Sequence, residues 1–287
     1  MASLKEVKGR IASVNNTRKI TSAMKMVASA KLHKAQAAIE SMLPYERRLH
    51  HILTDFMSNC TEVTSPFIVK REVKKVAVVV FASNTSLCGG FNANVIRHLV
   101  DLLAEYKPLG LENILVFPVG KKVADAVRKL GFRIEGDFQH MADKLSYQEA
   151  ADLAADLMKR FLHGDVDKVE LLYNHFKSTA SQILTRETYL PIDLNNEKKE
   201  EERTIDYILE PSAEELMQEM LPKVLRMKMF TVLLDSNAAE HAARTMAMQI
   251  ATDNANELLQ ELTVMYNKSR QQSITNELLD IVGGSMA

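Results

Sequence analysis

Two helical segments at the ends of the chain limit what this sequence can fold into. In residues 4–58 and again in residues 212–282, glycine is scarce and apolar side chains recur every three or four positions, which is typical of amphipathic helices. If unbroken, these helices would span about 80 Å and about 100 Å at roughly 1.5 Å per residue. Helices of that length cannot fold back into one compact domain, so we expect an antiparallel coiled coil that projects from the rest of the chain.

Each predicted helix contains a proline, which should bend or end it. Pro44 is followed at once by a renewed helical pattern, and Pro222 lies near the start of the C-terminal segment. The sequence alone does not decide between a bend and a break. Because the C-terminal segment is the longer one, we expect its last turns to extend beyond the paired region and Gly283–Gly284 to end it.

The segment between the two helices has a different pattern. Short apolar runs rich in β-branched residues alternate with amphipathic helices, which predicts a Rossmann-like α/β domain with a mainly parallel sheet. Its last two predicted strands can pair as a hairpin and give the sheet a mixed edge. We therefore divide the chain into an N-terminal coiled-coil helix (1–58), a central α/β domain (73–210) and a C-terminal coiled-coil helix (211–287).

Composition argues against several classes of protein. The formal net charge of -1 does not suit a dedicated nucleic-acid binder. No apolar run approaches the roughly 18–20 residues that a membrane-spanning helix needs, and no signal peptide precedes the first helix. The two cysteines, Cys60 and Cys88, form neither a CxxC pair nor a disulfide framework.

The loop SNTSLCGGFN, residues 83–92, is the best candidate for chemistry. It follows a predicted strand and precedes a predicted helix, where free backbone N–H groups can bind an anion. It lacks the glycine motifs of phosphate-binding loops, so a simple strand–helix turn is the favoured interpretation. The histidines show no zinc-ligand spacing, and no carboxylate pair suggests general acid–base catalysis. We expect no catalytic residue, no metal and no cofactor.

The C-terminal stretch YNKSRQQSITNELLDIVGG carries a mixed surface. At about 100° per residue, Arg270, Ile274, Glu277 and Ile281 fall on one helical stripe. Alternating polar and apolar side chains suit a protein interface. Packing of this face on the chain's own N-terminal helix remains an alternative. The N-terminal helix is rich in Lys and Arg, which fits either a solvated face or a surface for an acidic partner.

Three motifs together resemble the gamma subunits of F-type ATP synthases: KEVKGRIASVNNTRKITSAMKMVASAKL, SLCGGFN and AARTMAMQIATDNANELLQELTVMYNKSRQQSITNELLDIVGG. The resemblance covers nearly the whole chain. It implies a central rotor shaft that couples proton-driven rotation of the c ring to conformational cycling of the catalytic beta subunits. It further implies one copy per three alpha and three beta subunits, contacts with epsilon and the c ring, and a place on the cytoplasmic side of a bacterial inner membrane.

The resemblance also implies which residues contact partners. Contacts with the alpha and beta subunits are expected at Met24, Cys88, Arg270, Gln271, Thr275 and Glu277. Contacts with the c ring and epsilon are expected at Tyr207 and Glu210. Asp280 stands where glutamate is more usual, and the cysteine-containing insertion of plastid relatives is missing, so we expect no redox switch.

Two other classes of function stay open at this point. One is a small-molecule enzyme that uses the α/β domain and dimerises through its helices, for which nucleotide-dependent thermal stabilisation would be the signature. The other is a static coiled-coil scaffold, which has no need of a fixed ratio to alpha and beta subunits.

Overall fold

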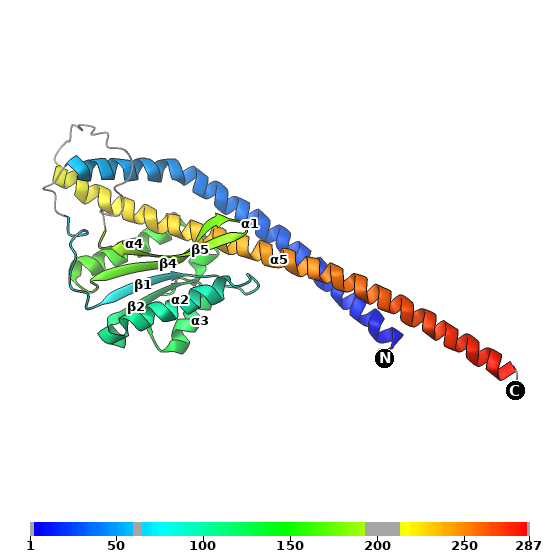
Figure 1. The fold of residues 1–287 in the computed structure, drawn as a ribbon. Helices are drawn as coiled ribbons and strands as arrows, with labels where there is room; N and C mark the ends of the chain where they lie inside the picture. Colours follow the sequence, from blue (N-terminus) through cyan, green and yellow to red (C-terminus); the bar gives the residue numbers. More distant parts are fainter. Residues whose placement is uncertain (1–2, 60–64, 193–212, 286–287) are drawn as a thin grey trace.

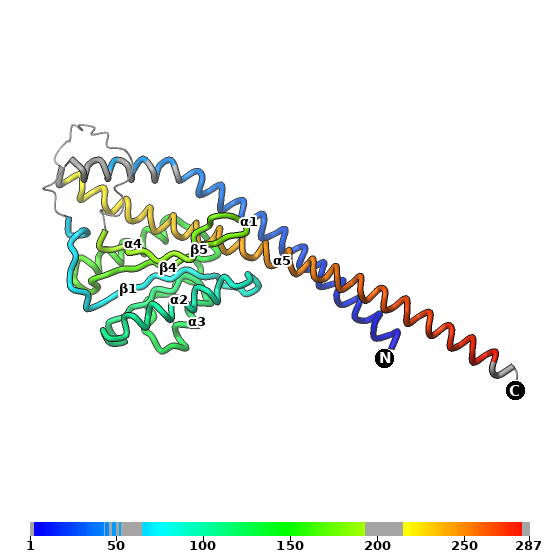
Figure 2. The backbone as a smooth tube through the Cα atoms, viewed as in Figure 1, coloured from blue at the N-terminus to red at the C-terminus, as the bar shows by residue number. Residues whose placement is uncertain are grey.

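The computed structural model describes residues 3–59, 65–192 and 213–285 (Figure 1). Two long helices, α1 (Leu4–Asn59) and α5 (Ala213–Ser285), lie side by side and run in opposite directions. An α/β domain packs against one part of α5, and the rest of the helix pair projects away from it (Figure 2). The predicted antiparallel pair with a central α/β domain is confirmed.

Neither proline ends its helix. Pro44 lies inside α1 and Pro222 lies inside α5, and both helices continue on either side. Pro222 is the tenth residue of α5 and lies beyond the first turn, so the helix loses one intrahelical N–H bond there and still continues. The predicted stop at Gly283 and Gly284 is wrong by a short margin, since α5 continues through both residues to Ser285.

The central sheet has five strands in the order β3-β2-β1-β4-β5. The strands are β1 (Val76–Phe81), β2 (Ile114–Val119), β3 (Arg133–Ile134), β4 (Lys168–Ser178) and β5 (Ser181–Leu190). Neighbouring strands are parallel except for the β4–β5 hairpin, which is antiparallel. The mainly parallel sheet with a mixed edge is therefore as predicted.

Helices cover both faces of this sheet. They are α2 (Phe91–Tyr106), α3 (Lys121–Leu130) and α4 (Tyr147–His163), with short 3₁₀ turns η1 (Lys107–Leu109), η2 (Leu111–Asn113) and η3 (Gln139–Ala142). Side chains of β1 alternate between two cores: Val79 and Phe81 face α4 and α5, whereas Val78 and Val80 face α2 and α3. Burial on both faces explains why β1 reads as an unbroken apolar run.

The first half of α5 covers one face of the sheet and also pairs with α1. A stripe of side chains spaced by four residues enters the sheet core: Met217, Leu221, Leu225, Met229 and Leu233. Farther along, Ala238 and Ala242 pack with Leu32 and Ala35 of α1. Alanines at these positions let the two helix backbones approach closely.

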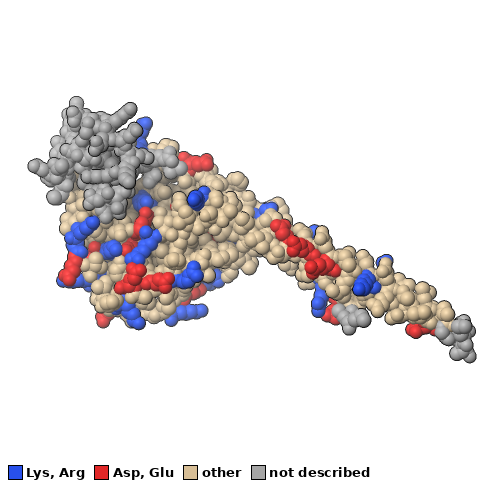
Figure 3. Space-filling view, viewed as in Figure 1, with Lys and Arg blue, Asp and Glu red and all other residues tan. Residues whose placement is uncertain are grey.

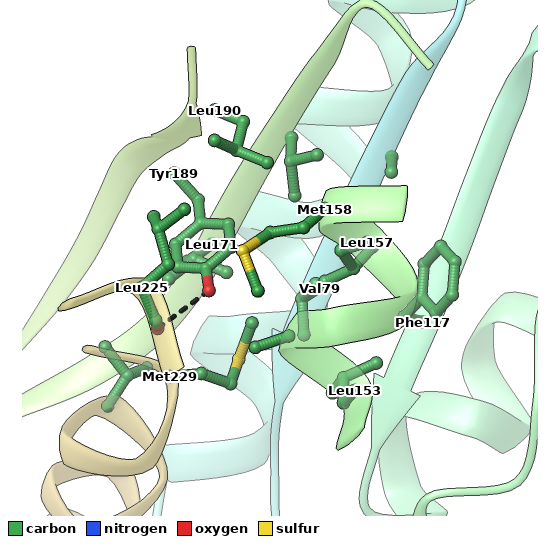
Figure 4. Close-up of a cluster of buried hydrophobic side chains, with 14 of the residues drawn as sticks. Val79, Phe117, Leu153, Leu157, Met158, Leu171, Tyr189, Leu190, Leu225 and Met229 are labelled. Atoms are coloured by element: carbon green, nitrogen blue, oxygen red, sulfur yellow. Dashed lines mark hydrogen bonds between the residues drawn. The ribbon is translucent and has the colours of Figure 1, made fainter. Parts of the chain in front are cut away.

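One hydrogen bond joins the sheet to α5 inside this core. The Tyr189 hydroxyl of β5 donates to the backbone oxygen of Leu225 at 2.8 Å (Figure 4). Tyr189 is fully enclosed, and burial raises the pKa of its hydroxyl far above the usual range. The hydroxyl therefore remains a hydrogen-bond donor at any physiological pH, and it fixes β5 against α5.

Replacing Tyr189 with Phe should lower the free energy of unfolding by about 1 kcal/mol, because the variant loses this hydrogen bond and keeps the buried ring. Urea unfolding of the full chain measures the change. Tyr147→Phe is the matched control, since Tyr147 is partly exposed and a surface change of this kind costs less than about 0.5 kcal/mol. Equal midpoints for the two variants would contradict the prediction.

Candidate partner-binding surface

Polar contacts between α1 and α5 set the register of the helix pair. The hydroxyls of Thr21 and Thr252 lie 2.8 Å apart, and Arg18 donates to Asn256 at 3.4 Å. In an antiparallel pair this register places the start of α1 opposite Ser269 of α5. Arg270 and the residues after it therefore extend beyond α1, as Figure 1 also shows at the red end of the chain. They do not pack on the chain's own N-terminal helix.

The part of α5 beyond Ser269, here called the tip, exposes an unusual amount of apolar surface. Five large side chains are about half exposed or more: Ile274 (48%), Leu278 (58%), Leu279 (63%), Ile281 (68%) and Val282 (57%). Figure 3 shows this end of the molecule as mostly uncharged, with isolated charged residues. Apolar side chains gathered in this way at the end of a helix mark a surface that another protein covers.

Four of the candidate contact residues lie on the tip. Arg270, Gln271, Thr275 and Glu277 are all exposed. The Thr275 hydroxyl donates to the backbone oxygen of Gln271 at 2.9 Å, which leaves its methyl group as the outward feature of that side chain. The fold thus gathers these residues among exposed apolar neighbours. Their contacts with a partner stay predictions.

A second group of exposed apolar residues lies along the helix pair on α1. Met24 itself is only half-buried, while Ile20, Met26 and Val27 are each about 60% exposed. Met24 therefore belongs to an accessible band of α1. Neighbouring Thr21 is buried at the contact with α5, so this part of α1 has one face on α5 and the other in solvent.

Cys88 lies in the turn before α2, and its contact with a partner stays a prediction. Its side chain is buried, and Asn92 donates to its sulfur at 3.1 Å. The neighbouring Leu87 is 60% exposed and has a φ of 69°. A partner that approaches this turn would meet Leu87 before the thiol, and Leu87 is a candidate that the sequence interpretation missed.

Two of the predicted contact residues, Tyr207 and Glu210, lie outside the described residues. Within the part of the chain that the structure describes, no three His, Cys, Asp or Glu side chains are grouped so that they could bind a metal ion. None of the described helices combines the length and the apolar character needed to cross a membrane.

Polar side chains in the middle of α5 attach it to the α/β domain. Asp235 accepts the Phe176 backbone N–H at 2.8 Å and lies 2.6 Å from the His175 ring nitrogen of β4. Asn237 donates to the backbone oxygen of Ala142 at 2.9 Å. The sequence carried a signal for this attachment, because the polar run Asp235, Ser236 and Asn237 interrupts a segment that is otherwise mostly apolar and small.

One turn farther along, two buried ionisable residues have opposite shifts of pKa. Burial raises the pKa of Glu240 to about 7, although the nearby Arg244 opposes that shift. Burial also lowers the pKa of His241 to about 4, and the charges of Lys31 and Arg244 lower it further. Asp143 of the α/β domain raises both values. The junction of α1, α5 and the α/β domain thus disfavours charge on both residues.

Comparison with known proteins points to one family. A family model described as ATP synthase matches residues 3–287. The ATP synthase gamma chain of Phocaeicola vulgatus is 82% identical over 289 residues, and that of Bacteroides fragilis strain ATCC 25285 is 64% identical over 290 residues; both matches cover 100% of each chain. Among solved structures, a chain of the Euglena gracilis mitochondrial ATP synthase (OSCP/F1/c-ring) has a TM-score of 0.65 at 20% identity, covering 99% of this chain and 93% of that one. A chain of the Tetrahymena thermophila central stalk/c-ring structure has a TM-score of 0.58 at 22% identity, covering 81% and 99%.

The two shifted groups make opposite contributions to stability. Glu240 has a higher pKa in the folded chain, so its favourable contribution is complete below pH 4.5 and is lost as the pH rises to about 7. His241 has a lower pKa in the folded chain, so its contribution is complete above pH 6.5 and is lost as the pH falls to about 4. In the natural chain these two dependences largely cancel.

Replacing either Glu240 or His241 should make the pH dependence caused by the other residue visible in the free energy of unfolding. In His241→Gln, the free energy of unfolding relative to the natural chain should fall by about 3 kcal/mol as the pH rises through this range. In Glu240→Gln it should rise by a similar amount. Urea unfolding at pH 4, 5, 6 and 7 measures both slopes, with Lys223→Gln as a control on the exposed side of α5. Parallel profiles for all the chains would contradict the assignment.

Proposed function

The chain belongs to the ATP synthase gamma-chain family, and from that premise we propose that it is the central rotor shaft of an F1Fo ATP synthase. It is a subunit of that complex without chemistry of its own. The observation that carries the proposal is the tip of α5, which extends beyond α1 and exposes Ile274, Leu278 and Ile281 at the end of the helix pair. An apolar tip of this kind suits insertion into a surrounding sleeve of partner subunits.

The helix pair is suited to transmitting torque. Two helices packed along their length resist bending and twisting more than one helix does, and the close approach at Ala238 and Ala242 joins them firmly. Residues 1–58 and 211–287 form the shaft in this proposal, and residues 73–210 form a base that turns with it. Rotation of the base by a proton-driven c ring then moves the tip among the catalytic beta subunits and changes their conformations in sequence.

The partners follow from the two ends of the shaft. Met24, Arg270, Gln271, Thr275 and Glu277 contact alpha and beta subunits in this proposal, together with the turn that contains Cys88. The scattered polar residues on the tip allow weak contacts at many orientations, which a rotating part needs. Tyr207 and Glu210 contact the c ring and epsilon. One copy serves three alpha and three beta subunits at the cytoplasmic side of a bacterial inner membrane.

The α/β domain offers little support for an enzyme. A hollow between the Gly89–Gly90 turn, the hairpin and α5 has a volume of about 220 Å³, whereas small-molecule sites usually measure at least about 300 Å³. It is lined by Met246, Ile250 and several amides, and it presents no arrangement of nucleophile and base. A static scaffold is the stronger rival, and the subunit ratio of the native complex distinguishes it from a rotor.

The triple variant Arg270→Ala, Thr275→Ala, Glu277→Ala should assemble into the complex and pump several-fold fewer protons per ATP hydrolysed. The reason is that the few residues that carry most of an interface's binding energy each cost about 2 kcal/mol or more when truncated, and we expect these three to be among them. ATP-driven acidification of membrane vesicles, divided by ATPase rate, measures the coupling. A control triple on exposed residues of the same helix, Gln218→Ala, Glu219→Ala and Lys223→Ala, should retain it.

Native mass spectrometry of the purified complexes gives the ratio of this chain to alpha and beta subunits. A ratio of one to three to three is expected for all the variants. A variable ratio would favour the static scaffold, and full coupling in the tip triple would remove those three residues from the proposed contact surface.

A further inference from the structure

The turn between β1 and α2 contains a residue in an unfavourable conformation. Leu87 has a φ of 69°, in the left-handed region that residues with a Cβ rarely adopt, and its side chain is 60% exposed. Hydrogen bonds from Ser83 to Thr85 and to Asn92 organise the base of the turn. Asn92 also donates to the Thr85 backbone oxygen at 3.4 Å and to the Cys88 sulfur at 3.1 Å, so residues on both sides of Leu87 are bonded within the turn. A contact from outside the turn would add to these bonds in holding the strained residue.

Arg244 of α5 supplies contacts to that outer part. Its Nη2 donates to the Thr85 hydroxyl at 2.9 Å and lies 3.4 Å from the backbone oxygens of Thr85 and Ser86. Its Nη1 donates to Glu240 Oε1 at 2.8 Å. One planar guanidinium thus joins the turn to a carboxylate one helical turn away, a geometry that the ammonium group of lysine cannot reproduce.

This ion pair is sheltered from solvent. The side chains of Arg244 and Glu240 are 11% and 7% exposed, in contrast to the Lys223–Glu219 pair of the same helix, whose side chains are 58% and 75% exposed. A surface pair contributes little to stability, whereas a buried guanidinium that loses its acceptors is destabilising. Lys31 of α1 and Asp143 of the α/β domain also face this point, so the pair stands where the three parts of the chain meet.

We propose that Arg244, held by Glu240, is a positioning residue that fixes the turn at residues 85–88 to α5, so that the α/β domain turns with the helix pair as one body. The functional part of this inference rests on the proposed rotor function. The structural part does not, because it concerns contacts within a single chain. Glu240 orients the guanidinium, and the guanidinium holds the turn in the conformation that exposes Leu87 and buries Cys88.

The burial of Cys88 provides a direct test on the full-length chain. With Cys60 replaced by Ser, the rate at which a maleimide modifies Cys88 reports how often the turn opens. Arg244→Met should raise that rate by about tenfold or more, the effect of losing a charged hydrogen bond. Arg244→Lys should give a smaller increase, since lysine keeps a charge beside Glu240. Lys223→Met, in the exposed pair, should leave the rate unchanged.

A second variant covers the case in which Arg244→Met does not fold. Thr85→Val removes the hydroxyl acceptor at the exposed end of the contact and leaves α5 intact, and it should also raise the rate of modification, by several-fold. Urea midpoints equal to those of the natural chain show that the change is local. Unchanged modification rates in both Arg244→Lys and Thr85→Val would overturn the structural part of the proposal.

The functional part is tested in the assembled complex. Arg244→Met should lower the number of protons pumped per ATP hydrolysed, and Arg244→Lys should restore part of it. Equal coupling in all variants, despite faster modification of Cys88, would overturn the functional part. Absence of any pumping in the complex with the natural chain would instead refute the rotor proposal, while the modification rates would still decide whether Arg244 fixes the turn.

Discussion

The middle of α5 is buried on every side, and the rest of the structure depends on that burial. From Val232 to Ala242 only Asp235 retains partial exposure. The sheet covers one side of this segment and α1 covers another, so a single stretch of helix completes the core of the α/β domain and the seam of the helix pair. Most side chains in SNAAEHAA, residues 236–243, are small, and Asn237 and Glu240 have hydrogen-bond partners, whereas the buried Nδ1 of His241 has none.

The overall architecture could be predicted from the sequence because it depends on periodicity. Apolar residues that recur every three or four positions over long segments predicted the two helices, and apolar runs such as β1 predicted a sheet buried on both faces. The sequence did not predict that side chains of α5 from Met217 to Leu233 enter the sheet core. These side chains interleave with the ones that face α1, so the two sets cannot be told apart by spacing. A helix that is buried on two sides has no clear polar face, so periodicity alone cannot say how many partners it has.

The candidate site was predictable only in part, for a similar reason. Exposure of the tip follows from the difference in length between the two terminal segments, and the sequence contains that difference. The turn at Leu87 and Cys88 is held by local bonds from Asn92 and also by Arg244, more than 150 residues away in the chain. No local pattern shows that a residue of the C-terminal helix contacts this turn.

The antiparallel register has a consequence for how the chain is made. Thr21 pairs with Thr252, a separation of 231 residues, so α1 cannot find its partner until nearly all of the polypeptide has been synthesised. Until then, the seam residues Leu32 and Ala35 lack cover. Long-range pairing of this kind is slow and prone to aggregation.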